Sequence, residues 1–468
     1  MSARRRVLSV SSILVVVIGA TAAAALAGAI SWGSAIEVPG TAGLNGGGAA
    51  TVNSVSCPSA GNCAAGGSYV DGSGHRQAYV SAEHAGVWGT AIEVPGTAHR
   101  NAGGFAQVYS VSCASAGNCA AGGTYTDASN VRHAYVVNEA GGVWGAAIDV
   151  RGTAYGHGAR VNSVSCRGAG ACVAGGFYVD GSSHSQAFVV MQHSGVWGRA
   201  LEVPHTAALN VGGSAYVASV SCTGAGNCAA GGTYTDGASH GQAFVVTEHS
   251  GVWRNAIEAP HTGALNLGGL AGVTSVSCAS AGNCAAGGIY KNGSGHYQAF
   301  VVDERTGVWG AAREVPGTAA LNHGGYATVT SVSCAGAGEC SAGGTYRDTA
   351  TTAQGFVVSE HGGVWHTAIR VPGSLGSNSS VESVSCGGAG YCAAGGFYSD
   401  SPFTSQAFLV AENGGVWSTR VEVPGTAALN LGGGGATHAV SCASTGYCVA
   451  GGSYTDGADT FQAFVTTP

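Results

Sequence analysis

Apolar and polar residues alternate along this chain in a short pattern that recurs from end to end. One unit contains four strand-like segments, separated by residues such as Gly, Asn, Asp and Ser; they are 217–222, 228–235, 242–248 and 252–260. Such segments predict β-strands joined by tight turns. No segment shows a sustained helical period. We therefore expect four strands per unit, named a to d in chain order, and a longer d–a loop (261–270 here) before the next unit.

Residues that occur once per unit show that the chain holds eight units. The tryptophans are Trp32, Trp88, Trp144, Trp197, Trp253, Trp309, Trp365 and Trp417. The 16 cysteines fall into C-x5-C pairs, one pair in each unit. A regular period of more than 50 residues, as between successive tryptophans, indicates a repeat architecture. Four short antiparallel strands per repeat are typical of a β-propeller blade.

Side-chain size and the chain ends favour a closed ring. Strands a and b carry Ser, Cys, Ala and Gly, whereas strands c and d carry Phe, Val, Trp and Ile, as expected where blades converge at an axis. The mature chain would begin with a lone strand d, Trp32–Pro39, and end with a strand c, Gln462–Val465. An open solenoid would need polar capping units. The sequence predicts an all-β, closed eight-bladed β-propeller with four antiparallel strands per blade, whose N-terminal strand completes the last blade.

The cysteine pairs predict one disulfide across each a–b hairpin, because cross-strand neighbours come within bonding distance. Two thiols per blade cannot complete a four-ligand zinc site, so we expect no metal. For a loop this short, loop-closure entropy predicts that each disulfide stabilises the folded protein by roughly 2 kcal/mol. The predicted pairs are Cys57–Cys63, Cys113–Cys119, Cys166–Cys172, Cys222–Cys228, Cys278–Cys284, Cys334–Cys340, Cys386–Cys392 and Cys442–Cys448.

The first residues have the features of a targeting segment. Three arginines, Arg4 to Arg6, precede an apolar run from Val7 to Ala27 that ends in small residues. This pattern predicts a signal peptide over 1–29 and the propeller over 30–468. An uncleaved anchor is the alternative, because about 20 apolar residues can also span a bilayer. We expect a secreted protein, or one anchored to the outer face of the cytoplasmic membrane.

Charge narrows the range of partners. Only 9% of residues are charged, and the formal net charge is −7. A chain of this kind without a basic patch is a poor nucleic-acid binder. We expect a monomer without cofactors that contacts a membrane only through an uncleaved N-terminal segment.

The repeated motif resembles that of a known group. Ser110-Val111-Ser112-Cys113, the paired Cys119 and the following Ala-Gly-Gly-x-Tyr segment resemble repeats of uncharacterised secreted actinobacterial β-propeller proteins. The wider layout is loosely similar to HAF-type extracellular repeats. Both resemblances imply a propeller and imply no particular activity.

One acidic or amide residue per blade follows the tyrosine that ends strand b. The functional interpretation is a ring of acceptors for sugar hydroxyls or Ca²⁺, whereas the simpler one is capping of the b–c turn by Asp or Asn side chains. We favour the turn cap, and we expect the glutamines that begin strand c to form inter-blade hydrogen bonds. The ring comprises Asp71, Asp127, Asp180, Asp236, Asn292, Asp348, Asp400 and Asp456.

Two d–a loops, Gly152–Arg160 and Gly373–Ser380, are shorter than the others and lack the Leu-Asn-x-Gly-Gly motif that most others keep. They enter the third and seventh blades, which lie opposite each other in a ring of eight. One hypothesis is that they leave a shallow trough across that face, and neutral deletion is the alternative.

The repeat leaves three functions open. We favour a secreted non-enzymatic module that binds a carbohydrate or protein surface multivalently through the face carrying the d–a loops and b–c turns. A secreted propeller hydrolase or lyase is the alternative, and a structural cell-envelope protein is a further one. An enzyme would need residues unique to one or two blades near the axis, and the sequence pattern singles out no catalytic residue. The fold alone does not choose among these functions.

Overall fold

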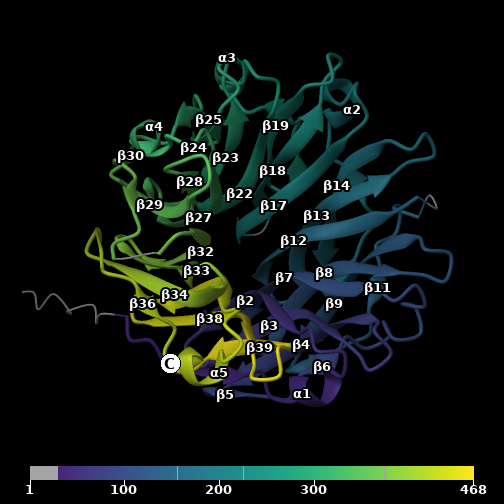
Figure 1. Ribbon diagram of the computed structural model, residues 1–468. Coiled ribbons are helices and arrows are strands. Elements are labelled where there is room, and N and C mark those ends of the chain that lie inside the picture. Colours follow the sequence, from purple (N-terminus) through teal and green to yellow (C-terminus); the bar gives the residue numbers. More distant parts are fainter. Residues whose placement is uncertain (1–29, 155–156, 225, 374–375, 468) are drawn as a thin grey trace, which may run out of the picture.

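The computed structural model describes residues 30–467 apart from 155–156, 225 and 374–375. It shows eight antiparallel sheets arranged radially around one axis (Figure 1), which confirms the predicted propeller. The signal peptide predicted over 1–29 lies outside the described residues. Within the described part of the chain, no helix is long and apolar enough to cross a membrane.

Strands a and b form the inner half of each blade. Strands a are β2 (Thr51–Ser59), β7 (Ala106–Ser115), β12 (Ala159–Gly168), β17 (Ala215–Gly224), β22 (Ala271–Ser280), β27 (Ala327–Gly336), β32 (Ser379–Gly388) and β37 (Ala436–Ser444). Strands b are β3 (Asn62–Val70), β8 (Asn118–Thr126), β13 (Ala171–Val179), β18 (Asn227–Thr235), β23 (Asn283–Lys291), β28 (Glu339–Arg347), β33 (Tyr391–Ser401) and β38 (Tyr447–Thr455).

Strands c and d form the outer half. Strands c are β4 (Arg76–His84), β9 (Arg132–Ala140), β14 (Ser185–His193), β19 (Gly241–His249), β24 (Tyr297–Arg305), β29 (Ala353–His361), β34 (Thr404–Asn413) and β39 (Phe461–Thr466). Strand d is divided in blades one to seven, as β5 (Val87–Trp88) and β6 (Ile92–Glu93), β10 (Val143–Trp144) and β11 (Ile148–Asp149), β15 (Val196–Trp197) and β16 (Leu201–Glu202), β20 (Val252–Trp253) and β21 (Ile257–Glu258), β25 (Val308–Trp309) and β26 (Arg313–Glu314), β30 (Val364–Trp365) and β31 (Ile369–Arg370), and β35 (Val416–Trp417) and β36 (Val421–Glu422).

The structure differs from the sequence prediction at two places in the outer blade. Strand d is interrupted because its middle turns to the preceding blade, where the Ala256 N–H donates to the Pro204 carbonyl. Five d–a loops contain one helical turn, too short to give a periodic pattern: α1 (Thr41–Leu44), α2 (Thr206–Leu209), α3 (Thr262–Leu265), α4 (Thr318–Leu321) and α5 (Thr426–Leu429).

A β-bulge in strand a explains the Ala-Gly-Gly motif of strand b. The register shifts between Val52 and Ser54, so that Asn53 is the extra residue. The Thr51 carbonyl then lies so close to Gly67 that a Cβ there would be 1.9 Å from its oxygen. A Cβ on Gly66 would be 2.7 Å from the Val108 side chain of the next blade. Only glycine fits at either position.

All eight predicted disulfides are present, and the described residues include no free cysteine. The paired Cα atoms are 3.9–4.1 Å apart because the a–b hairpin brings the two cysteines together, as where Cys113 and Cys119 are direct cross-strand partners. Eight disulfides are consistent with an extracellular protein.

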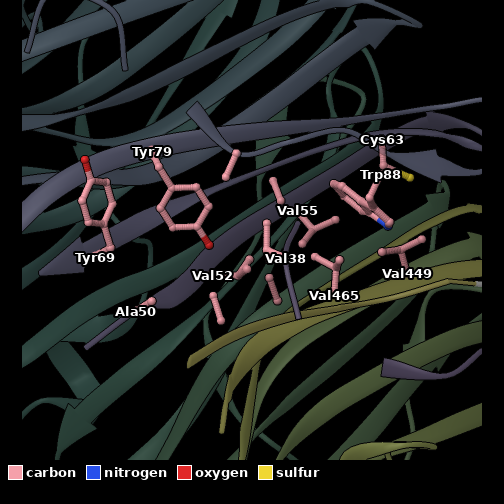
Figure 2. Packing of buried hydrophobic residues seen from close by; sticks show 14 of the residues in the cluster. Val38, Ala50, Val52, Val55, Cys63, Tyr69, Tyr79, Trp88, Val449 and Val465 are labelled. Carbon is pink, nitrogen blue, oxygen red and sulfur yellow. The ribbon is translucent and has the colours of Figure 1, made fainter. Parts of the chain in front are cut away.

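The hydrophobic core lies between the blades, and it continues across the junction of the chain ends. β1 (Ala35–Glu37) pairs antiparallel with β39, which confirms that the N-terminal strand completes the eighth blade. Figure 2 shows Val449 and Val465 of that blade beside Val52, Val55 and Trp88 of the first. The ring therefore closes through both backbone pairing and side-chain burial.

Candidate functional site

The blades present two different faces. We call the face that carries the d–a loops the upper face. There each d–a loop lies beside the start of strand c in the preceding blade; for example, the Arg76 N–H donates to the Gly104 carbonyl. On the lower face, the a–b and c–d turns of one blade meet, as where the Gly86 N–H donates to the Gly61 carbonyl. The predicted ring of Asp and Asn residues belongs to the upper face.

The carboxylates of this ring cap their own turns. Asp236 Oδ1 accepts the N–H groups of Ala238 and His240, both at 2.9 Å, and Oδ2 accepts Gln242 Nε2 at 2.9 Å. These hydrogen bonds hold the pKa of Asp236 below its usual value, although partial burial opposes them most strongly. The favoured interpretation as a turn cap therefore has a structural basis, while ligand binding by the ring stays a prediction.

The same pattern holds around most of the ring. Hydrogen bonds within the turn are made by Asp71, Asp127, Asp180, Asp236, Asn292, Asp400 and Asp456. Asp348 differs, because its buried Oδ1 has no hydrogen-bond partner among the described residues. The structure does not bring the ring members together at one site, since each belongs to the turn of a different blade.

The glutamines of strand c form the expected inter-blade hydrogen bonds. Gln242 Oε1 accepts Asn266 Nδ2 of the next d–a loop at 2.9 Å, and Asn266 also donates to the Gly241 carbonyl. The equivalent pairs are Gln77–Asn101, Gln186–Asn210, Gln298–Asn322, Gln406–Asn430 and Gln462–Asn45. In the short loop entering blade seven, Ser379 donates to Gln354 instead. Both short loops include residues outside the described part, so the trough stays a prediction.

Aromatic rings flanked by cations interrupt the repeat on the upper face. Phe105, at the end of a d–a loop, lies between two guanidinium groups, with Arg76 at 5.7 Å and Arg132 at 5.0 Å from the ring centroid. In the next blade, Arg160 lies 4.9 Å from the Tyr109 ring centroid and 5.4 Å from that of Phe177. We call these the first and second cation–aromatic clusters.

A third cluster lies in the fifth and sixth blades. The rings of Tyr297 and Tyr326 meet with centroids 5.7 Å apart. Arg347 lies 5.4 Å from the Tyr326 centroid, and Lys291 lies 5.6 Å from that of Tyr297. The aromatic rings of all three clusters are partly exposed.

The bulge residues of strands a form an inner ring. They are Asn53, Tyr109, Asn162, Ala218, Thr274, Thr330, Glu382 and His438. Asn53 donates to the Val108 carbonyl at 2.8 Å and Thr330 to the Val381 carbonyl at 2.6 Å, so each links its strand to the next blade.

Glu382 and His438 replace these links in blades seven and eight. His438 Nδ1 lies 2.7 Å from Glu382 Oε2, and its Nε2 lies 3.0 Å from Ser453 Oγ. The sequence analysis missed this group, which contains residues unique to two blades. The available signal was the varying residue two positions before each Val-Ser-Cys segment, which is Glu382 in one unit and His438 in the next.

A second ring, also missed, consists of polar side chains buried near the lower face. Each is the cross-strand partner of the second cysteine or the tryptophan of its blade, as Glu304 is of Cys284 and Trp309. Burial raises the pKa of Glu304, and it raises that of Glu360 to about 7. Among the described residues, its members are Glu83, Glu139, Gln192, Glu248, Glu304, Glu360 and Glu412, all buried.

The lower face also has a groove of about 300 Å³ between blades one and two. Its lining includes His84, Ile92, Val143 and Trp144. The buried Nε1 of Trp144 has no partner in the described structure, because Ala82 stands where other blades place an acceptor such as Asn138, which binds Trp197. Among the described residues, no group of His, Cys, Asp and Glu side chains could hold a metal ion.

Comparison with known proteins gives similarities of fold alone. No protein-family model matches the chain, and no curated protein matches it. An ulvan lyase of polysaccharide lyase family PL25 is 10% identical with a TM-score of 0.44, over 94% of this chain and 95% of that one. The β-propeller domain of the Trilobed protease from Pyrococcus furiosus is 7% identical with a TM-score of 0.43, over 80% and 97%. YCF48 from Cyanidioschyzon merolae is 11% identical with a TM-score of 0.41, over 81% and 97%.

Proposed function

We propose that the protein is a secreted binding module that holds an acidic extracellular polysaccharide on its upper face. The observation that carries the proposal is the set of three cation–aromatic clusters, above all Phe105 between Arg76 and Arg132. These side chains are specific to their blades, whereas the Asp, Gln and Asn residues of the same face are occupied with one another.

The chemistry of the clusters suits a uronic acid. The apolar face of a sugar ring can pack against an aromatic ring, and a guanidinium group can bind a carboxylate in bidentate geometry. Arg132 and Arg347 are exposed, so their charges are accessible to a ligand. The net charge of −7 opposes a polyanion elsewhere on the surface, so contact would be favourable only at the clusters.

Several clusters on one face favour a polymer over a short oligosaccharide. Each cluster is small and only partly exposed, and would bind weakly alone. A chain that engages two clusters gains from the high effective concentration of the second site. We therefore expect affinity to rise with polymer length and to fall with added salt.

Titration calorimetry with a polyuronate and with a neutral glucan of matched length tests the proposal. The polyuronate should bind more tightly, and Phe105→Ala or Tyr326→Ala should weaken its binding by about 5- to 30-fold, the equivalent of about 1–2 kcal/mol. Phe403→Ala is the control, since Phe403 is 94% exposed on the same face but outside the clusters.

Three results would contradict the proposal. Equal binding of the neutral glucan would remove the role of the cations. Loss of binding in His84→Ala but in neither cluster variant would move the site to the lower-face groove. Absence of binding to any polysaccharide would favour a structural role in the cell envelope.

A further inference from the structure

We propose that Glu382, His438 and Ser453 form a catalytic triad that hydrolyses small carboxylic esters at the propeller axis. This activity goes beyond binding and does not depend on the polysaccharide proposal. It rests on the spatial arrangement of three side chains that blades seven and eight bring together.

The geometry has the arrangement of a nucleophile, a base and an orienting acid. His438 Nε2 lies 3.0 Å from Ser453 Oγ, within reach to accept its proton. His438 Nδ1 lies 2.7 Å from Glu382 Oε2, which fixes the ring orientation and favours the tautomer that leaves Nε2 free to accept. The imidazole thus joins the two oxygen atoms through its two different nitrogens.

The equivalent position in another blade shows how this arrangement differs from a structural hydrogen bond. Thr124 holds the position of Ser453 in blade two, where it is fully buried and its hydroxyl is 3.0 Å from the carbonyl oxygens of both His133 and Ala159. Among the described residues, His438 is the one hydrogen-bond partner of Ser453 Oγ. In the described structure, no backbone carbonyl therefore competes for the proton that a nucleophile must transfer.

Exposure points to the class of substrate. The side chains of His438 and Glu382 are 30% and 28% exposed, so solvent reaches the base. Ser453 is only 7% exposed, and its strand partners are the small residues Ala436 and Ala463. The low exposure and the small neighbours favour a small acyl group such as acetyl at Oγ over a long acyl chain. We therefore assign acetate esters as the substrate class.

The chemical steps balance without a further reactant. Ser453 Oγ adds to the ester carbonyl carbon while its proton passes to His438 Nε2. The bond between that carbon and the alcohol oxygen breaks, and the leaving alcohol takes the proton from His438. Water then attacks the carbonyl carbon of acetyl-Ser453 while His438 Nε2 takes its proton. Acetate leaves, and the proton returns from His438 to Ser453 Oγ, which regenerates the hydroxyl.

Hydrolysis of 4-nitrophenyl acetate and of 4-nitrophenyl octanoate by the disulfide-bonded protein tests the assignment. The acetate should react faster. Ser453→Ala and His438→Ala should each lower the rate at least about a hundredfold. Glu382→Gln should lower kcat about tenfold or more with little change in KM, and Glu382→Asp should restore part of it, as expected of a positioning residue.

Thr124→Ala provides the matched control, because it removes a hydroxyl from the same strand position in another blade. It should leave the rate unchanged. Mass spectrometry after brief exposure to the ester, followed by acid quenching, should find the acetyl group on Ser453. A wild-type rate in Ser453→Ala, acetylation at another side chain, or no hydrolysis by the folded wild-type protein would overturn the assignment.

Discussion

A single asparagine shows how one side chain can join two blades on the upper face. Asn266 is 7% exposed, and its Oδ1 accepts the Leu270 N–H at 2.7 Å while Nδ2 donates to Gly241 and Gln242. Through Gln242 the hydrogen bonds continue to the cap residue Asp236. The loop, the start of strand c and the b–c turn are therefore held by one connected set of polar groups.

Asn266→Ala should lower the free energy of unfolding by about 2–3 kcal/mol, because it leaves buried polar atoms of the neighbouring blade without partners. Urea unfolding followed by tryptophan fluorescence measures the change. Leu267→Ala is the control, since Leu267 is 72% exposed in the same loop. Equal effects of the two substitutions would show that the hydrogen bonds contribute nothing beyond the loop itself.

At the scale of the blade, strand c combines an apolar interior with a buried acid. Glu304 Oε1 accepts Thr247 Oγ1 of the preceding blade at 2.8 Å, but its buried Oε2 has no partner in the described structure. The ionised carboxylate is therefore poorly solvated, which is why its pKa is raised. Gln192 holds the same position in blade three, so a neutral amide is compatible with the blade.

Glu304→Gln should stabilise the protein at pH 8 by about 1 kcal/mol, since it removes a charge that is costly to bury. Differential scanning calorimetry at pH 8 and pH 5 measures the gain, which should shrink at pH 5, where the glutamate is more often protonated. A substitution that destabilises equally at both pH values would show that the carboxylate is well satisfied in its charged form.

The pH dependence of the wild type follows from the same groups. Glu360 has a usual pKa of 4.5 that is raised to about 7 in the folded protein, so between these values the folded state binds more protons than the unfolded one. Stability should therefore rise as the pH falls from 8 to 5. Asp236 and Asp456 have lowered pKa values, so their contribution is lost as the pH falls below about 4. A melting temperature that declines steadily from pH 8 to 5 would contradict this.

At the scale of the whole molecule, the chain ends hold the ring shut. Three residue pairs join β1 to β39, and the Ala35 N–H also donates to the Pro424 carbonyl of blade seven. Asn45 then binds Phe461 and Gln462 from the other end of the chain. These contacts cover two sheet edges that would otherwise be open to pairing with other molecules.

Deletion of Trp32–Pro39 should leave blade eight with three strands and an exposed edge. We expect aggregation or loss of a single cooperative thermal transition, measured by light scattering and calorimetry. The matched control is the chain that begins at residue 30. A truncated protein that melts as one monomeric unit would show that the closure strand adds little to the ring.

The sequence by itself determined the number of blades, the order of strands, the disulfide pairs and the closure of the ring. The strands, turns and disulfide pairs recur in every unit and are specified by local patterns: alternation for strands, glycine and aspartate for turns, and C-x5-C for each hairpin. The closure of the ring was predicted from the strands at the two ends of the chain. The inter-blade role of Gln242 and its equivalents was predicted for the same reason.

Only the tertiary structure decided which single side chains meet. Glu382 and His438 are far apart in the sequence, and they meet because each is the bulge residue of an adjacent inner strand. Burial of Glu304 and its equivalents follows from the neighbouring blade, which the alternation within one strand does not describe. The repeated sequence specifies each blade locally. A site between blades is formed by residues that break the repeat, and the closed ring sets the distances between them.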